Sequence, residues 1–456
     1  MLKLYNTLTR EKEILKKKLI KIYVCGPTVY DYAHLGHGRS AVVFDLLRRY
    51  LLFKGYNIRF VSNYTDIDDK IIKRAKERNL TEKQLTEEMI TAYEEDYSKL
   101  NILKPDVQPK ATEYIKEMIS LIKKLEKNNY TYIISGDGVY YDISKFKDYG
   151  KLSHQKIEDL EAGKRINNEN KRNPEDFVLW KFYKEGEPFW GSKWGKGRPG
   201  WHIECSAMST KILGKRIDIH GGGQDLIFPH HEDEIAQTEA IIKKQFSRFW
   251  MHNGFVTVND EKMSKSLENF FLLRDIYKKY DPLVIRWFLL TTSHYRAPLN
   301  YSEDMLEQSK HSLEKLKDFT RRLKEYDSDS LGYKNTIKMI KIYEKEFIKK
   351  LDDDLEISGA LNILYEFLKE ANILLAEKRF SKEDSVLLLE FIEKIDSVLG
   401  VLKEEEIPKE IIELTKKRLE LRKEKNWFEA DKIREEIRSK GYNIDDSDGK
   451  SIIKRL

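Results

Sequence analysis

The sequence predicts an α/β protein whose doubly wound parallel sheet is split by a long insertion and followed by helices. A short apolar run at residues 19–25 ends at a Gly-Pro turn and is typical of a buried strand. A helical pattern follows at about residues 38–53, and residues 57–62 are typical of a second strand. Strand–helix–strand units of this kind are characteristic of parallel sheets.

The second half of this sheet is expected farther along the chain. A strand pattern at residues 217–220 runs into three glycines, and a helix is expected to begin near Pro229 because proline is favoured in the first turn. The intervening chain has a charged helical pattern at residues 81–129 and then short strands and loops. After about residue 298, apolar residues separated by charged ones predict packed amphipathic helices.

We therefore expect five segments, with Pro408 after an acidic run marking the last boundary. They are 1–100, the first half of a Rossmann-like domain; 101–199, a connective insertion; 200–305, the second half; 306–403, a helical bundle; and 408–456, a small basic tail module.

Composition excludes several classes of protein. Aromatic residues make up 11% of the 456 residues, which argues against a disordered chain. The net charge of +6 permits a polyanionic partner without requiring one. Two distant cysteines do not make a disulfide-stapled secreted module, the first twenty residues are too charged for a secretory signal, and no apolar stretch is long enough to cross a membrane. We therefore expect a cytoplasmic protein without a membrane segment.

Two histidines flank a glycine where the first strand gives way to a helix. Backbone N–H groups and the positive end of the helix dipole make this a natural place for phosphate. The imidazoles of His34 and His37 could donate to phosphate oxygens, and Gly36 would let a nucleotide approach the backbone. The competing interpretation is a loop with two surface histidines.

A second candidate phosphate segment is Lys-Met-Ser-Lys-Ser at residues 262–266. Lys262 and Lys265 are separated by small residues, which suits a mobile loop that places positive charge on a leaving pyrophosphate. The competing interpretation is an ordinary solvated loop.

The two cysteines belong to a candidate metal-ligand set with His230 and Glu234. On the predicted helix, His230 and Glu234 are one turn apart and share a face. Two thiolates, one imidazole and one carboxylate are a plausible zinc set. The spacing lacks the paired cysteines of a structural zinc finger, so the alternative is that Cys25 and Cys205 pack as apolar core residues.

The sequences at 34–37 (HLGH) and 262–266 (KMSKS) resemble, in the usual order, the two signatures of class I aminoacyl-tRNA synthetases. Leu35 replaces the usual isoleucine in the first, and Glu268 replaces glycine after the second. Five longer strings are CGPTVYD at 25–31, NYTDIDDKI at 63–71, GRPGWHIECSAMS at 197–209, DIHGGGQDLIFPHHEDEIAQ at 218–237 and HYRAPLNYSE at 294–303. These five strings resemble cysteinyl-tRNA synthetases.

The resemblance implies a cysteine–tRNA ligase. In that family, cysteine reacts with ATP, in the presence of Mg²⁺, to give cysteinyl-adenylate and pyrophosphate, and cysteine is then transferred to the 3′ end of tRNA(Cys). One zinc ion per chain would bind the substrate thiolate and so reject serine without an editing domain. The implied residues are His34, Gly36, His37 and Lys265 for ATP binding, His34, His37, Lys262 and Lys265 for catalysis, and Cys25, Cys205, His230 and Glu234 for zinc.

Other residues are implied as supporting groups. Asp225 is expected to pair with the substrate ammonium, Thr65 to line the pocket and Trp201 to pack over the amino acid. Three further histidines could hold the ligands in place: His202, His220 and His231.

The tail is the expected contact with RNA. Residues 427–437 (WFEADKIREEI) resemble a helix of the family's anticodon-reading module, whereas the alternative is a charged helix whose aromatic residues pack on the helical bundle. The expected partners are tRNA(Cys), cysteine and ATP, and the expected state is a monomer. Two rivals remain: a ligase that joins cysteine to an amine-bearing sugar, and a non-catalytic zinc protein that binds RNA or senses redox state.

Overall fold

The computed structural model describes residues 1–155, 170–258, 261–263, 270–402, 408–447 and 450–455. The chain divides into two compact units, Met1–Val401 and Leu402–Leu456. Among the described residues, every helix is too short or too polar to cross a membrane.

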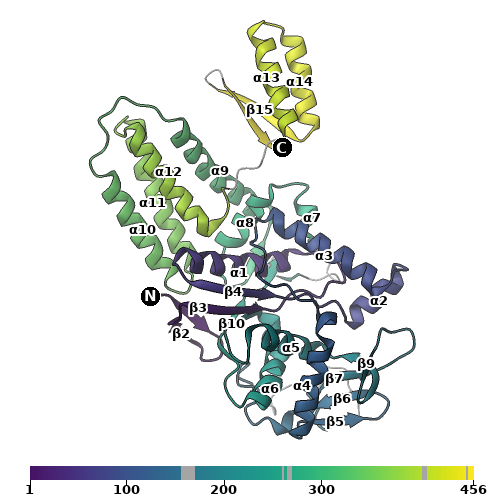
Figure 1. Cartoon of the computed structure of the whole chain (residues 1–456). Coiled ribbons are helices and arrows are strands. Elements are labelled where there is room, and N and C mark those ends of the chain that lie inside the picture. The colour runs from purple at the N-terminus through teal and green to yellow at the C-terminus, as the bar shows by residue number, and fades with distance from the viewer. Residues whose placement is uncertain (156–169, 259–260, 264–269, 403–407, 448–449, 456) are drawn as a thin grey trace. The chain divides into compact units, whose positions relative to one another are not determined.

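A four-stranded parallel sheet lies at the centre of the first unit (Figure 1). Its strand order is β11-β10-β3-β4. Strand β4 therefore lies on one side of β3, and the later strands β10 and β11 lie on the other side. The order reverses between β3 and β10, and the carboxyl ends of strands at such a switch point are where open α/β sheets bind ligands. The expected fold class is confirmed. The strands are β3 (Leu19–Val24), β4 (Asn57–Ser62), β10 (Ile217–Gly223) and β11 (Ser247–Asn253).

Helices connect and cover these strands. Helix α1 begins at Leu35, three residues before the predicted start, because His34 caps it. It passes so close to β10 that a β-carbon on Gly221 would collide with the ring of Phe44. The hairpin and helices of this region are β1 (Lys3–Asn6), β2 (Glu11–Ile14), α1 (Leu35–Phe53), α5 (Trp201–Leu213) and α6 (Glu232–Ile242).

The insertion contains helices and a separate antiparallel sheet in the order β5-β6-β7-β9-β8. Its residues share one apolar core with α5 and α6, so the insertion also supports the central sheet. Helices α2 (Asp69–Glu77) and α3 (Glu82–Lys99) precede the insertion. The elements of the insertion are η1 (Ala111–Tyr114), α4 (Ile115–Lys127), β5 (Thr131–Ile134), β6 (Gly138–Tyr141), η2 (Ile143–Lys145), β7 (Phe177–Phe182), β8 (Trp190–Ser192) and β9 (Gly195–Pro199).

From Glu303 to Leu399 the described chain is helical, as expected after about residue 298. Short strands and helices come first, and four longer helices then form the bundle beside α1 (Figure 1). The elements are β12 (Val256–Val258), β13 (Glu261–Lys262), α7 (Leu273–Ile276), α8 (Pro282–Thr291), β14 (Leu299–Tyr301), α9 (Glu303–Glu325), α10 (Thr336–Leu351), α11 (Ile357–Ala376) and α12 (Lys382–Leu399).

The second unit packs two helices and a hairpin around a small isoleucine core. Trp427 and Phe428 lie at the start of its second helix, and the side chain of Lys432 lies over the Phe428 ring at 4.5 Å. The elements are α13 (Lys409–Lys423), α14 (Trp427–Ser439), β15 (Tyr442–Ser447) and β16 (Lys450–Arg455). The hairpin is a feature that the sequence patterns did not predict.

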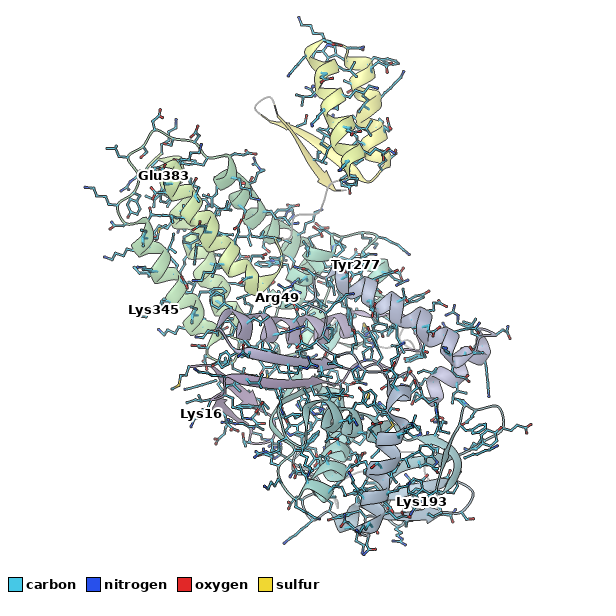
Figure 2. All side chains as sticks on the ribbon, in the orientation of Figure 1. Lys16, Arg49, Lys193, Tyr277, Lys345 and Glu383 are labelled. Atoms are coloured by element: carbon cyan, nitrogen blue, oxygen red, sulfur yellow. The ribbon has the colours of Figure 1, made fainter. Side chains whose placement is uncertain are left out.

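A buried ion pair joins the signature helix to the bundle. Arg286 of α8 donates to Asp45 of α1 at 2.6 Å and to the carbonyl of Leu399 at 2.7 Å. Arg49 also donates to Asp45, and Figure 2 shows Arg49 where α1 meets the bundle. Arg286 is 0% exposed and Asp45 3% exposed. The orientation of α1, and of the histidines at its start, therefore depends on this pair.

Replacing Arg286 with methionine should strongly destabilise the first unit. The variant leaves the Asp45 carboxylate in the interior without its main partner, which costs about 3 kcal/mol. The matched control is Arg321→Ala, which breaks an exposed pair with Asp318 and should cost less than about 1 kcal/mol. Urea unfolding of both variants measures the difference, and equal losses would contradict a structural role for the buried pair.

Candidate metal centre and nucleotide site

Four metal-ligand side chains converge at the switch point of the sheet. Cys25 directly follows β3, and Cys205 lies on α5. His230 lies in the turn Ile227–His231 that precedes α6, and Glu234 lies in the first turn of α6. One ligand atom from each lies within 4.8 Å of all the others. The Sγ atom of Cys25 lies 3.3 Å from Glu234 Oε1, and His230 Nε2 lies 3.2 Å from the same oxygen.

The start of α6 differs from the sequence expectation. The regular helix begins at Glu232 rather than near Pro229, and a wider turn at Ile227–His231 precedes it. Phe228 within this turn has an extended backbone, with φ −134° and ψ 129°. His230 and Glu234 nevertheless remain one turn apart and meet on one face, as the sequence predicted.

The cluster gathers groups that repel one another when ionised. Burial first, and then the neighbouring Cys205 and Glu234, raise the pKa of the Cys25 thiol well above its ordinary value. The second carboxylate oxygen, Glu234 Oε2, is buried and has no hydrogen-bond partner among the described residues. Two thiols, an imidazole and a carboxylate with an unused oxygen fit a thiophilic divalent cation, which would relieve this repulsion.

The predicted supporting histidines surround this cluster. His202 Nδ1 lies 3.0 Å from His230 Nδ1, whereas His220 and His231 approach Cys25 Sγ with their Nε2 atoms at 3.4 and 3.3 Å. The half-exposed ring of Trp201 stacks on His230, with ring centroids 4.3 Å apart. Trp201, which the sequence analysis expected to pack over the bound amino acid, therefore lies beside the metal-ligand cluster.

The other two expected substrate residues differ in their surroundings. Thr65, which follows β4, is buried and donates from Oγ1 to Glu204 Oε2 at 2.9 Å. Asp225 is exposed on the turn Gln224–Leu226 after β10. Glu204 itself is a residue that the sequence reasoning missed. Burial raises its pKa well above the ordinary value, and the only sequence signal was its place next to Cys205.

At the start of α1, the histidines cap the helix themselves. His34 Nδ1 accepts from the backbone N–H groups of Gly36 and His37, at 3.1 and 3.3 Å, and the two imidazoles stack 3.6 Å apart. The expectation that these N–H groups stay available for phosphate is therefore wrong for this arrangement. His37 Nδ1 in turn accepts from the backbone N–H of His34, with Tyr93 Oη 3.0 Å away.

This capping fixes the tautomer of both rings. Because each Nδ1 accepts a hydrogen bond, the proton of each neutral imidazole lies on Nε2. Burial first, and then the nearby His34, lower the pKa of His37 well below its ordinary value, so His37 is neutral near pH 7. His37 therefore provides an uncharged N–H donor rather than an imidazolium cation.

The described residues on either side of 264–269 lie beside the HLGH turn. The chain that follows KMSKS pairs with the HLGH turn, since Leu35 N–H donates to the Phe271 carbonyl and Leu273 N–H to the Ala33 carbonyl, at 3.0 and 2.9 Å. A β-carbon on Gly36 would lie 3.0 Å from the His34 ring and 3.6 Å from the Met263 side chain. Lys265 lies outside the described residues, as does the Lys262 side chain.

Comparison with known families and proteins agrees with this arrangement. Residues 11–311 match the family described as "tRNA synthetases class I (C) catalytic domain", and residues 346–403 match the DALR domain. A cysteine–tRNA ligase from Geobacillus sp. (strain WCH70) is 49% identical, covering 98% of this chain and 97% of the relative. Those of Caldicellulosiruptor saccharolyticus and Thermococcus gammatolerans are each 46% identical; the matches cover 100% of this chain and 100% and 99% of the relatives.

Solved structures support the fold. A Mycobacterium tuberculosis methionyl-tRNA synthetase in complex with methionyl-adenylate superimposes with a TM-score of 0.63 at 15% identity, covering 85% of this chain and 90% of that one. The Agrobacterium radiobacter K84 agnB2 LeuRS-tRNA-LeuAMS complex gives 0.62 at 9% identity, covering 84% and 83%. The fold, the family match and the full-length relatives agree: this chain belongs to the cysteine–tRNA ligases, a family of class I aminoacyl-tRNA synthetases.

Proposed function

We propose that this protein activates cysteine with ATP and transfers it to tRNA(Cys), and that a zinc ion in the Cys25 cluster selects cysteine. The observation that carries this proposal is the convergence of two thiols, an imidazole and a carboxylate at the switch point of the sheet. Cys25 directly follows β3, the strand that also leads to the HLGH turn, so one member of the cluster is a neighbour of the proposed nucleotide site along the chain.

In this proposal, one zinc ion per chain is held by Cys25, Cys205, His230 and Glu234. When bound, zinc supplies a thiophilic Lewis acid that favours the ionised sulfur of cysteine over the hydroxyl of serine. The protein's part is to fix the donors. His202 orients His230, and the contacts of His220 and His231 hold Cys25 in place.

The remainder of the amino acid would be positioned by three residues around the cluster. Trp201, stacked on His230, offers an apolar surface beside the substrate side chain. Asp225 supplies an exposed carboxylate for the substrate ammonium, and Thr65 forms part of the pocket wall through its bond to Glu204. The substrate carboxylate would then be directed toward the nucleotide.

ATP, with Mg²⁺, is assigned to the HLGH turn and the KMSKS segment. The substrate carboxylate attacks the α-phosphorus, the bond to the bridging oxygen breaks, and pyrophosphate leaves with the electron pair. His34 and His37 would donate from Nε2 to phosphate oxygens as charge builds there. Lys262 and Lys265 would neutralise the leaving pyrophosphate, and Gly36 leaves room for close approach to the histidine pair.

The transfer of cysteine to tRNA would involve both units of the chain. A terminal hydroxyl of tRNA(Cys) would attack the acyl carbon of the adenylate and release AMP. The second unit, with aromatic and basic side chains on α14, is the proposed contact with the anticodon. The five segment boundaries, the cytoplasmic location and the monomeric state stay predictions.

Cysteine should support ATP–pyrophosphate exchange far better than serine. A ratio of at least about 10³ is expected, because serine lacks the sulfur that the cluster is built to bind. His230→Asn should lower the exchange with cysteine by at least about tenfold by removing one donor. His311→Asn, which changes an exposed histidine on α9, is the control. Equal exchange with both amino acids would contradict the proposed function.

Replacing Lys265 with alanine should slow adenylate formation without weakening cysteine binding. Loss of one positive charge beside the leaving pyrophosphate should lower the rate by about 10²–10³-fold. Single-turnover formation of the adenylate and equilibrium binding of cysteine separate the two effects. The exposed Lys278 provides a control alanine variant, and parallel losses of rate and cysteine affinity would refute the assignment.

A further inference from the structure

A second set of four donors lies within the same cluster. His220, at the centre of β10, and His231, just before α6, direct their Nε2 atoms toward Cys25 and Glu234. The ligand atoms of these four residues also lie within 4.8 Å of one another. The set shares Cys25 and Glu234 with the proposed zinc position, but it replaces Cys205 and His230 by two other imidazoles.

The spacing of this second set is that of a tetrahedron around a metal ion. Bonds of about 2.0–2.3 Å place tetrahedral ligand atoms about 3.3–3.8 Å apart. Cys25 Sγ lies 3.3 Å from Glu234 Oε1, 3.4 Å from His220 Nε2 and 3.3 Å from His231 Nε2. The two imidazoles lie 3.4 and 3.9 Å from Glu234 Oε1. Four of these five distances fall within the tetrahedral range and the fifth is 0.1 Å beyond it, so the donors are gathered closely enough to share one ion.

The shared residues face both donor sets. Glu234 Oε1 lies 3.2 Å from His230 Nε2 of the first set and 3.4 Å from His220 Nε2 of the second. Because Cys25 and Glu234 belong to both sets, the two positions compete for these donors. With the Cys25 thiolate and the Glu234 carboxylate, two neutral imidazoles complete a set whose charge balances a divalent cation.

His231 is also oriented as metal ligands usually are. Its Nδ1 lies 2.8 Å from His252 Nε2, and His252 Nδ1 lies 2.8 Å from the Thr7 hydroxyl. When His231 donates from Nδ1 to His252, and His252 donates to Thr7, the lone pair of His231 Nε2 points into the cluster. An imidazole whose second nitrogen is held in this way is typical of metal sites.

We propose that the cluster contains a second position for a borderline divalent cation such as Zn²⁺, formed by Cys25, His220, His231 and Glu234. An ion there takes two donors away from the first position, so its occupancy opposes binding of the substrate sulfur. The inference adds to the proposed function but rests on its own donors, and it does not depend on which amino acid is activated.

Two double variants of the full-length protein separate the positions. Cys205→Ala with His230→Asn removes half of the first set and leaves the second intact. Cys205→Ala with His220→Asn retains three donors of the first set and breaks the second. After metal removal, equilibrium dialysis against Zn²⁺ should find about one ion bound by the first variant and at least tenfold weaker binding by the second.

Cys205→Ala with His231→Asn gives an independent break of the second set, and Cys205→Ala with His202→Asn is the control that should keep the ion. Thermal unfolding of the metal-free proteins identifies any variant that fails to fold. If the variant with His220→Asn fails to fold, the comparison uses the variant with His231→Asn, and the reverse. Tighter binding by the variants that lack His220 or His231, or equal binding by all, would overturn the second position. These measurements use no amino acid, so a failure of cysteine activation would leave them unaffected.

Discussion

Burying two thiols and a carboxylate against one another is the constraint on which the rest of this structure depends. Such groups cannot all ionise without a cation, as the raised pKa of Cys25 shows. The fold brings them together from three places far apart in the chain: the end of β3, the first turns of α5 and the start of α6. Each of these elements is fixed by the shared core of the central sheet and the insertion. The cost of gathering the donors is thus offset by the packing of this core, which includes Cys205 itself.

The same architecture couples the cluster to the nucleotide site. Cys25 ends the strand that leads into the HLGH turn, and the backbone after KMSKS is hydrogen-bonded to that turn. Capping of α1 by His34 sets the tautomer of both histidines, so their donor atoms are determined before any ligand arrives. The buried Arg286–Asp45 pair then fixes α1 against the bundle. In the proposed function, amino-acid selection and phosphate binding would therefore depend on one strand, one turn and one helix.

Sequence reasoning predicted the features that depend on local pattern. The strand at 57–62 and the helical second half follow from apolar periodicity, and the family resemblance identified the Cys25, Cys205, His230 and Glu234 set, which spacing alone did not. The start of α6 was misplaced because the extended Phe228 breaks the regular turn. The sequence could not show whether His220 and His231 face the cysteine thiol, because the direction of each ring depends on β10 and on that irregular turn. The terminal hairpin was missed because its strands are rich in Asp, Ser and Lys, which are poor strand formers.

The central claim is that the Cys25 cluster binds metal and that the substrate sulfur joins it there. Absorption spectroscopy of the cobalt-substituted protein tests this claim most directly, because thiolate-to-cobalt bands respond to each sulfur donor. The account predicts that cysteine intensifies and shifts these bands, whereas serine at the same concentration leaves them unchanged. A cobalt spectrum that is identical with and without cysteine would contradict it.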